Sequence, residues 1–460
     1  MSGRSIVSRN PYTGQIIKEF PFITNNELGQ KIEKAYQAYL YNRKVNLKTR
    51  CDKLLQVARL LEQNAESYGR LIATEMGKPI SQAIPEVKKS ANQCKFYVQH
   101  SEKFCRPDRV KTEARKTLVE YHPLGAIYHL TPFNFPIWLC AKGCVPSLLL
   151  GNTILHRNSD STPLCGLALE ELFQEAGFEE GEFQNVFTSH EQAETVLSHP
   201  YVRGLCFTGS SKAGGTLGAI AGKYCKKSVL ELGGSDPFIV MKDADIELAV
   251  NLAIQARLQN AGQVCIAGKR FIIHADVYER FRDKLVEKVH DIKLGDPLKP
   301  ETQMGPLARP DLVENIDKQV KQAIKEGGNL LYGGKRPEGE EFEKGNFYMP
   351  TIIEVQNGNI ITKEETFGPV FALMKAKNEE EIVTLANDTP YGLGCAIVSR
   401  DTDRAEEIGE RIEAGSVFIN DTVKTDSRVP AGGVKYSGHG RELGQFGITE
   451  FANVKTVWVK

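Results

Sequence analysis

The sequence has few of the features that mark secreted, membrane-spanning or nucleic-acid-binding proteins. Its 460 residues carry 58 basic and 58 acidic side chains, so there is no net charge to attract a nucleic acid or an anionic membrane. No apolar run approaches the roughly 18 residues that a membrane span needs. The first residues, MSGRSIVSRNPYTG, contain no apolar segment of a secretion signal. Ten cysteines without a CxxC pair are too few for a disulfide framework, so we expect a reducing cytoplasm.

The composition is that of a globular protein with large cores. Hydrophobic residues make up 41% of the chain and charged residues 25%. The length suggests about three structural units. Short β-branched runs alternate with helical patterns, and no internal repeat is visible. This alternation predicts an α/β fold with parallel sheets.

Hydrophobic periodicity and helix-end signals place the main elements. One helical face contains Leu28, Ile32, Ala35 and Tyr39, and another contains Ile84, Val87, Ala91, Cys94 and Val98. Further helices are expected from Pro136, over 246–259, from Thr402, and from an N-cap at Thr162 with Pro163 in its first turn and Gly177 past its end. Strands are expected at 125–130, 153–156, 202–207, 228–232, 270–274, 370–374, 395–399, 416–420 and 451–459.

Two features indicate how these elements are divided. Glu231-Leu-Gly-Gly follows a predicted strand, and its glycines allow a close backbone approach, which makes it a plausible seam between two sheets. The last predicted strand, at 451–459, has no helix after it. Such a strand either pairs with another subunit or is an ordinary edge strand, and the sequence favours neither.

Most of the cysteines suit apolar settings and need no chemical role. Cys140 and Cys144 form a CxxxC pair with no second pair of ligands nearby, so we expect no metal site. Cys265 differs because it lies in Gln259-Asn-Ala-Gly-Gln-Val-Cys265, a loop between a helix and a strand. A thiol in such a loop can be exposed and held still, although spacing alone does not make it a nucleophile. The inert thiols are expected at Cys206, Cys225 and Cys395.

A thiol nucleophile needs a base and an oxyanion donor. Glu231 at the end of a strand is either a solvated ion or a general base that faces a cleft. Asn134 lies between two prolines in Thr131-Pro-Phe-Asn-Phe-Pro136, where its amide forms either an Asx turn or an oxyanion contact. The Gly/Ser turn at 207–215 could hold phosphate on a helix N-terminus, but it matches neither the P-loop nor the GxGxxG fingerprint.

Taken together, these segments resemble the NAD(P)-dependent aldehyde dehydrogenase superfamily over nearly the whole chain. Glu231 and Cys265 lie 34 residues apart, which is the usual spacing of the base and the nucleophile in that family. Around these two residues the chain is most similar to bacterial succinate-semialdehyde dehydrogenases of the shorter, NAD-preferring type. The matching motifs, in family order, are Pro132-Phe-Asn-Phe-Pro136, Gly151-Asn-Thr, Phe207-Thr-Gly-Ser210, Glu231-Leu-Gly-Gly234, Gly262-Gln-Val-Cys265, Glu365-Thr-Phe-Gly-Pro369 and Gly440-Arg-Glu-Leu443.

The resemblance implies a division of the chain and a set of catalytic roles. Residues 1–107 and 126–230 would form a Rossmann-type cofactor domain, 231–430 a catalytic domain, and 108–125 with 445–460 the strands of an oligomerisation element in a homodimer or homotetramer. Cys265 would attack the aldehyde carbon, and Asn134 with the Cys265 backbone N–H would hold the oxyanion. Glu231 would activate the water that hydrolyses the thioester.

The resemblance also implies the cofactor contacts. Glu365 would bind the nicotinamide ribose with Phe367 beside the ring, and Ser210 would lie under the pyrophosphate. Arg157 and Asp160 would flank the adenine ribose, where the family usually has Lys and Glu. An acidic side chain repels a 2′-phosphate whereas arginine attracts one, and we expect NAD with NADP as the alternative. The remaining residues implied at the cofactor are Phe133, Gly209 and Leu232.

Charge suggests the substrate. Trp138 and Lys142 share a helix face, and related enzymes commonly have an arginine at the position of Lys142 for the distal carboxylate of the substrate. Lys142 could also be a surface lysine with no such role. Gln259 replaces a second arginine of those enzymes, and Arg257, Lys424, Ser427 and Arg428 could compensate.

We therefore expect oxidation of succinate semialdehyde, or a similar short carboxylated aldehyde, to the acid. One alternative is a dehydrogenase of an uncharged or aromatic aldehyde, and another is a catalytically idle scaffold. CoA-dependent acylation is a fourth possibility, against which Glu231 argues because it can serve a deacylating water. No nucleic acid, membrane or metal partner is expected.

Overall fold

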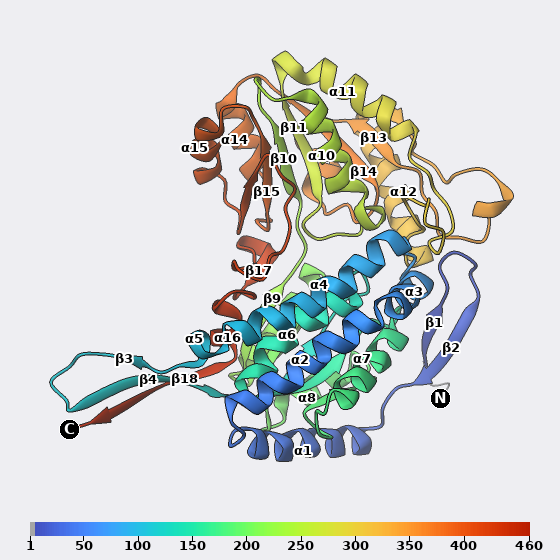
Figure 1. Ribbon diagram of the computed structural model, residues 1–460. Helices are drawn as coiled ribbons and strands as arrows, with labels where there is room; N and C mark the ends of the chain where they lie inside the picture. The colour runs from blue at the N-terminus through green and yellow to red at the C-terminus, as the bar shows by residue number, and fades with distance from the viewer. Residues whose placement is uncertain (1–4) are drawn as a thin grey trace.

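Two large sheets lie one above the other in the computed structural model, which describes residues 5–460 (Figure 1). The lower sheet has the order β17-β9-β8-β5-β6-β7, and its strands are parallel except β17. Residues 1–4, which begin both the expected cofactor domain and the segment MSGRSIVSRNPYTG, lie outside the described part. The strands are β5 (Ala126–Leu130), β6 (Thr153–Arg157), β7 (Phe183–Asn185), β8 (Val202–Thr208), β9 (Lys227–Glu231) and β17 (Gly438–His439).

The helices of the lower half enclose this sheet from both sides, and β1 and β2 form a separate hairpin. The buried helix α6 packs against α2 and α4, whereas α1 and α9 lie against the sheet. These elements are β1 (Ser5–Arg9), β2 (Ile16–Pro21), α1 (Asn25–Asn42), α2 (Leu47–Gln63), α3 (Ala65–Met76), α4 (Ile80–Gln99), α5 (Ser101–Cys105), α6 (Pro136–Leu150), α7 (Pro163–Glu175), α8 (Gln192–Ser198) and α9 (Ser211–Lys223).

The upper sheet has the order β12-β13-β14-β11-β10-β15-β16 and is parallel except for β12. Its apolar strands and covering helices form one large buried core. The elements are β10 (Asp236–Val240), α10 (Ile246–Leu258), β11 (Gly268–His274), α11 (Ala275–His290), α12 (Pro310–Lys325), β12 (Asn329–Tyr332), β13 (Thr351–Glu354), α13 (Ile360–Lys363), β14 (Val370–Ala376), α14 (Glu379–Asn387), β15 (Cys395–Val398), α15 (Thr402–Glu410) and β16 (Val417–Ile419).

A three-stranded sheet projects from the side of the molecule (Figure 1). Its central strand is β4 (Lys116–Pro123), flanked by β3 (Asp108–Arg109) and by the terminal strand β18 (Ala452–Val459), which follows α16 (Phe446–Glu450). The terminal strand therefore has a partner within its own chain. Its outer edge is free in the described residues, and Val454 and Trp458 are about half exposed.

The α/β class with parallel sheets is confirmed, and each predicted strand matches an observed strand to within a few residues. Glu231-Leu-Gly-Gly is the seam that the sequence suggested, because β9 ends at Glu231 in the lower sheet and β10 begins at Asp236 in the upper one. The strand β10 itself was not predicted, because it is a short apolar run that follows almost directly after the two glycines.

One expected helix cap is wrong in detail. Thr162 is at the N-cap of α7 and Pro163 is in its first turn, but the Thr162 side chain makes no capping hydrogen bond. Glu75 from α3 accepts the Leu164 and Cys165 N–H groups in its place, at 3.0 and 2.9 Å. Long-range capping of this kind leaves no signal near the helix start.

Glu86 from α4 does the same for α6, the helix that begins just after Asn134. Its Oε1 accepts the backbone N–H groups of Ile137 and Trp138 at 3.0 and 3.1 Å. Its Oε2 forms an ion pair with Lys78, and both side chains are 1% exposed. A buried carboxylate thus serves the free N–H groups of a helix whose own N-cap residue has no polar side chain.

Replacing Glu86 with alanine is expected to lower the free energy of unfolding by about 3–5 kcal/mol, because Lys78 would stay buried without its counter-charge. The midpoint of thermal unfolding, measured by calorimetry, checks this. Glu406→Ala on α15, where the glutamate is exposed, is the matched control and should unfold with the wild type. An unchanged midpoint for Glu86→Ala would show that the pair and the cap contribute no net stability.

No helix within residues 5–460 is long and apolar enough to cross a lipid bilayer. All ten cysteines lie in that range, and each of them is a free thiol.

Candidate active site

The lower sheet has its topological switch point between β5 and β8. From β5 the chain proceeds outward through β6 and β7, and then returns to place β8 on the other side. Ligands of open α/β sheets bind at the carboxyl ends of strands at such a point. Most of the expected cofactor residues lie at these strand ends: Phe133 after β5, Arg157 at the end of β6 and Asp160 after it, Gly209 and Ser210 after β8, and Leu232 after β9. Glu365 and Phe367 come from the segment before β14 of the upper sheet.

The loop that carries Cys265 has an unusual backbone. Asn260, Ala261 and Gly262 are consecutive residues with left-handed φ angles of 52°, 54° and 76°. A side chain at Gly262 would meet the Gly368 carbonyl oxygen at 2.3 Å, so only glycine fits there. Such conformations are costly for residues other than glycine and persist where the surroundings determine them. The loop therefore presents Cys265 from a fixed backbone.

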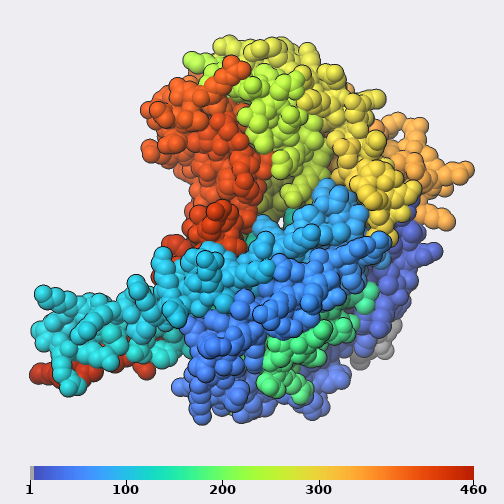
Figure 2. Space-filling view, in the orientation of Figure 1, coloured from blue at the N-terminus to red at the C-terminus, as the bar shows by residue number. Residues whose placement is uncertain are grey.

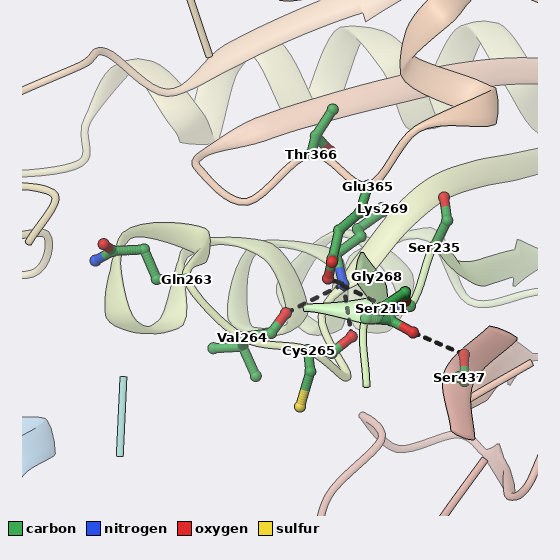
Figure 3. Close-up of polar contacts among 12 residues, drawn as sticks. Ser211, Ser235, Gln263, Val264, Cys265, Gly268, Lys269, Glu365, Thr366 and Ser437 are labelled. Atoms are coloured by element: carbon green, nitrogen blue, oxygen red, sulfur yellow. Dashed lines mark hydrogen bonds and ion pairs between the residues drawn. The ribbon is translucent and has the colours of Figure 1, made fainter. Parts of the chain in front are cut away.

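Lys269 holds the same loop from behind. Its Nζ donates to the carbonyl oxygens of Val264 and Cys265 at 3.2 and 2.5 Å and pairs with Glu365 at 3.2 Å. Figure 3 shows the Cys265 sulfur pointing away from these contacts. Burial raises the pKa of the Cys265 thiol to about 11, although Lys142 and Lys269 act in the opposite direction. The resting thiol is therefore protonated at neutral pH.

Asn134 lies directly against the Cys265 loop. Its side-chain Nδ2 donates to the Gln263 backbone carbonyl oxygen at 2.9 Å. The backbone carbonyl oxygen of Asn134 accepts from Asn260 Nδ2 at 3.0 Å. The side chain is buried, and one of its two N–H bonds is used by Gln263. The second N–H bond of the amide is available to another acceptor.

Glu231 belongs to a buried network of charges. Lys142 Nζ lies 2.5 Å from Glu442 Oε2 and 3.5 Å from Glu231 Oε2, and all three residues are at most 7% exposed. Burial raises the pKa of Glu231 to about 7, with Lys142 opposing the rise. Burial alone would lower the pKa of Lys142, but the two carboxylates outweigh it and raise that pKa. Glu231 is therefore a carboxyl group that can change protonation near neutral pH.

A cavity of about 300 Å³ opens onto these groups. Figure 2 shows the molecule hollowed on the side where the orange-red part of the upper half overhangs the blue and cyan helices. Cys265, Glu231, Lys142, Trp138 and Gln259 line the cavity, as the sequence analysis suggested for a common site. The pocket is of the size that small-molecule sites have.

Lys89 of α4 is a second cation of this pocket, and the sequence analysis missed it. Its Nζ lies 4.1 Å from the centre of the Trp138 ring and donates to Thr425 Oγ1 at 2.6 Å. Within residues 5–460 it has no ion pair with a carboxylate, whereas Lys142 has two. Burial, followed by the nearby Lys142, lowers the pKa of Lys89 to about 8, so the side chain is mostly charged at neutral pH.

Three residues that were considered for the substrate do not line the cavity, and one of them, Arg428, is exposed and pairs with Asp426 at 2.6 Å. Arg257 is completely buried, and its guanidinium donates to the carbonyl oxygens of Thr366 and Gly368. Ser427 donates to Gln93 and does not line the cavity. Arg257 supports the segment before β14 in place of binding a ligand, and this corrects the earlier suggestion.

The expected cofactor residues have partners that bear on their roles. Arg157 is buried and pairs with the half-exposed Asp160 at 2.7 Å. Glu365 Oε1 also accepts the Gly234 N–H at 3.2 Å, and the rings of Phe367 and Phe133 meet edge to face with centres 6.0 Å apart. Ser210 is the N-cap of α9, where its side chain accepts the Ala213 N–H. The N–H groups of Ser211 and Lys212 at this helix start are left for a ligand.

Fold and pocket together define an α/β enzyme with a loop thiol, a buried carboxyl group and a strand edge of the kind that binds dinucleotides. The chain belongs to the aldehyde dehydrogenase family, whose family model matches residues 1–457. It is therefore an enzyme that oxidises an aldehyde with a nicotinamide cofactor.

Relatives cover almost the whole chain. The succinate semialdehyde dehydrogenase [NAD(P)+] Sad of Escherichia coli is 38% identical over 453 residues, 98% of this chain and 97% of that protein. The succinate-semialdehyde dehydrogenase [NADP(+)] of Deinococcus radiodurans is 38% identical over 455 residues, 99% and 94% of the two chains. A succinic semialdehyde dehydrogenase from Streptococcus pyogenes, solved with NADP+, has a TM-score of 0.96 and 34% identity over 98% of this chain and 99% of that one.

Proposed function

We propose that the protein oxidises succinate semialdehyde to succinate with a nicotinamide dinucleotide, through a thioester on Cys265. The observation that carries the substrate is the unpaired cation Lys89 in the pocket that holds Cys265 and Glu231. A short aldehyde with a carboxylate at its far end could pair that carboxylate with Lys89 while its carbonyl carbon reaches Cys265. The names of the relatives support the same substrate class.

The chain's own residues would serve the bond-making and hydrolytic steps of the proposed chemistry. Cys265 forms the bond to the aldehyde carbon, and its proton leaves to a base. Asn134 and the Cys265 backbone N–H stabilise the oxyanion, a contribution of about 3–4 kcal/mol for each donor in comparable sites. Hydride loss from the adduct leaves a thioester. Glu231 then takes a proton from water as the water attacks the thioester carbon. The C–S bond breaks, the sulfur of Cys265 leaves as the thiolate, and succinate is released.

Lys142 is proposed as a positioning residue in this scheme. Its contacts with Glu231 and Glu442 support a role in holding the base and in setting its protonation. This differs from the expectation that Lys142 binds the carboxylate of the substrate. Glu442 belongs to the motif Gly440-Arg-Glu-Leu443, so a carboxylate partner for Lys142 was present among the predicted motifs but was given no role there.

The residues at the strand edge fit a dinucleotide. The free N–H groups at the start of α9 suit a pyrophosphate, and Glu365 has a carboxylate oxygen, Oε2, that could accept ribose hydroxyls. When bound, the dinucleotide supplies the hydride acceptor. Phe133 and Phe367 would pack beside it, and Gly209 and Leu232 would line its path.

We propose that NAD is preferred over NADP, although the names of the relatives favour NADP. The exposed carboxylate of Asp160 would lie next to a 2′-phosphate, and Arg157, which could attract one, is already paired with Asp160. The ratio of kcat/KM for the two cofactors measures this preference. A higher value with NADP would contradict it, and Asp160→Ser should shift the ratio towards NADP in either case.

Replacing Lys89 with alanine should raise KM for succinate semialdehyde by about ten- to a hundred-fold, the loss expected for one charge-assisted hydrogen bond. KM for butanal, which has the same chain length without the carboxylate, should change little. In the wild type, KM for the charged aldehyde should also rise above about pH 8 as Lys89 loses its proton. Steady-state kinetics with both aldehydes measures these effects.

Lys424→Ala is the matched control, because Lys424 also lines the pocket but is exposed and paired with Asp421. Lys142→Ala should reduce kcat for both aldehydes alike. If Lys142→Ala instead selectively raised KM for the charged aldehyde while Lys89→Ala did not, the carboxylate would belong to Lys142. Equal effects of Lys89→Ala on both aldehydes would favour the alternative of an uncharged substrate.

We also propose that the projecting sheet joins copies of this chain into a homodimer or homotetramer. The exposed Val454 and Trp458 on the outer strand support this proposal, since a free strand edge with apolar side chains favours pairing. Light scattering on the purified protein measures the mass, and a monomer would contradict the proposal.

A further inference from the structure

Behind the active site, the fold gathers two histidines and two cysteines that no step of the proposed reaction uses. His129 and His156 are neighbours on the parallel strands β5 and β6, and Cys140 and Cys144 lie one turn apart on α6. All four side chains are at most 1% exposed. Their ligand atoms all lie within 4.8 Å of one another. The sequence suggested no metal site because the CxxxC pair lacked nearby ligands, and the fold supplies them from two strands.

The distances resemble those of a tetrahedral metal site. With Zn–S bonds of about 2.3 Å and Zn–N bonds of about 2.0 Å, tetrahedral ligands lie about 3.8 Å apart for two sulfurs and about 3.3 Å apart for two nitrogens. The two cysteine sulfurs lie 3.8 Å apart, and the two Nδ1 atoms 2.9 Å apart. Cys144 Sγ lies 3.1 Å from His129 Nδ1. The two close pairs would have to separate by a few tenths of an ångström, and ligand atoms that lie up to 4.8 Å apart would have to draw closer together.

The neighbours of His156 fix its ring in the form that a metal requires. Asn158 donates through Nδ2 to the Thr162 carbonyl oxygen, which directs its Oδ1 to His156 Nε2. Nε2 therefore carries the proton, and the lone pair on Nδ1 faces the cluster, where His129 Nδ1 lies 2.9 Å away. A hydrogen bond from the remote ring nitrogen to an oxygen is the usual support of a metal-binding histidine.

The charge balance favours a divalent cation at this depth. Two thiolates and two neutral imidazoles around Zn²⁺ carry no net charge and need no counter-ion. Binding would release the two thiol protons to solvent, one for each Zn–S bond formed.

We propose that His129, His156, Cys140 and Cys144 form a closed structural site for Zn²⁺ that ties α6 to β5 and β6. The site has no open ligand position and no surface access, so the metal would enter as the chain folds. Gly143 lies between the cluster and the Lys142–Glu442 pair: a side chain there would meet His129 Nε2 at 2.6 Å and Glu442 Oε1 at 3.1 Å. The metal would therefore steady the helix that carries Lys142.

The test uses the full-length protein purified from cells grown with added zinc and then dialysed. Mass spectrometry of the metal content should find about one zinc per chain. The double variant Cys140→Ser with Cys144→Ser should lose about nine-tenths of it or more. Cys265→Ser and Cys395→Ser should keep the metal, because one removes the reactive thiol and the other a buried thiol of the upper sheet. Retention of zinc in the double variant would overturn the proposal.

A second measurement covers the case in which the double variant does not fold. Wild-type protein refolded with Co²⁺ should show a thiolate-to-cobalt charge-transfer band and the strong visible bands of a tetrahedral site. Refolding with a chelator should lower the thermal midpoint of the wild type. If the refolded wild type holds neither cobalt nor zinc after dialysis, the cluster is a set of buried neutral groups and the proposal is wrong. Neither readout depends on catalytic activity.

Discussion

Cys265→Ala is expected to lower kcat by about 10⁵-fold, because no other residue of the pocket can form the bond to the aldehyde carbon. Binding of the nicotinamide cofactor should be unaffected, since Cys265 is not among the expected dinucleotide contacts. Steady-state assays together with cofactor titration by calorimetry measure the two effects separately. Cys225→Ala should retain full activity; this thiol is exposed, which corrects the expectation of a buried thiol there.

The chemistry of the thiol gives the same prediction a second measurement. Because burial raises the pKa of Cys265 to about 11, the free enzyme should react slowly with iodoacetamide at neutral pH and faster as the pH rises. A Cys265→Ala enzyme that still turned over aldehyde at a wild-type rate would refute the thioester route.

Glu231→Gln is expected to release one equivalent of reduced cofactor and then stall, because the amide cannot take a proton from the hydrolytic water. The loss of steady turnover should be about 10²–10⁴-fold, as for the removal of a general base. Stopped-flow absorbance of the reduced cofactor distinguishes the burst from the steady rate. Sustained turnover at the initial rate would mean that another group activates the water.

The pH dependence follows from the burial of Glu231. Burial raises its pKa to about 7, and only the carboxylate form acts as a base. Deacylation in the wild type should therefore increase as the pH rises through about 7. The variant Glu231→Gln lacks this group, so its residual deacylation rate should not increase over that pH range. An increase that persisted in the variant would come from the titration of a different residue.

The parts of the fold that local patterns control could be predicted from the sequence. Short runs with β-branched residues predict the strands that end at Leu130, Arg157, Thr208 and Glu231. Their parallel order follows from the helices between them. The resemblance to the aldehyde dehydrogenase superfamily then implied roles for Cys265, Glu231 and Asn134. The structure places Cys265 and Glu231 on one pocket and Asn134 against the Cys265 loop.

Contacts between distant segments could not be predicted. Lys89 lies on α4, and only its packing against Trp138 and Thr425 reveals that it faces the pocket. Glu86 and Glu75 cap helices that start about 50 and 90 residues later in the chain. Lys142 was assigned to the substrate because its position on the helix was visible, whereas its two carboxylate partners were not.

The different origins of the pocket residues have a consequence for how this enzyme could change. The reacting sulfur depends on the left-handed backbone of 260–262, whereas Lys89 comes from a helix of the lower layer with its own packing. If Lys89 holds the substrate carboxylate as proposed, a substitution at position 89 would alter which aldehyde is accepted without disturbing the sulfur or its base. The selectivity of the enzyme for its aldehyde could then change through single replacements on α4 while Cys265 and Glu231 are retained.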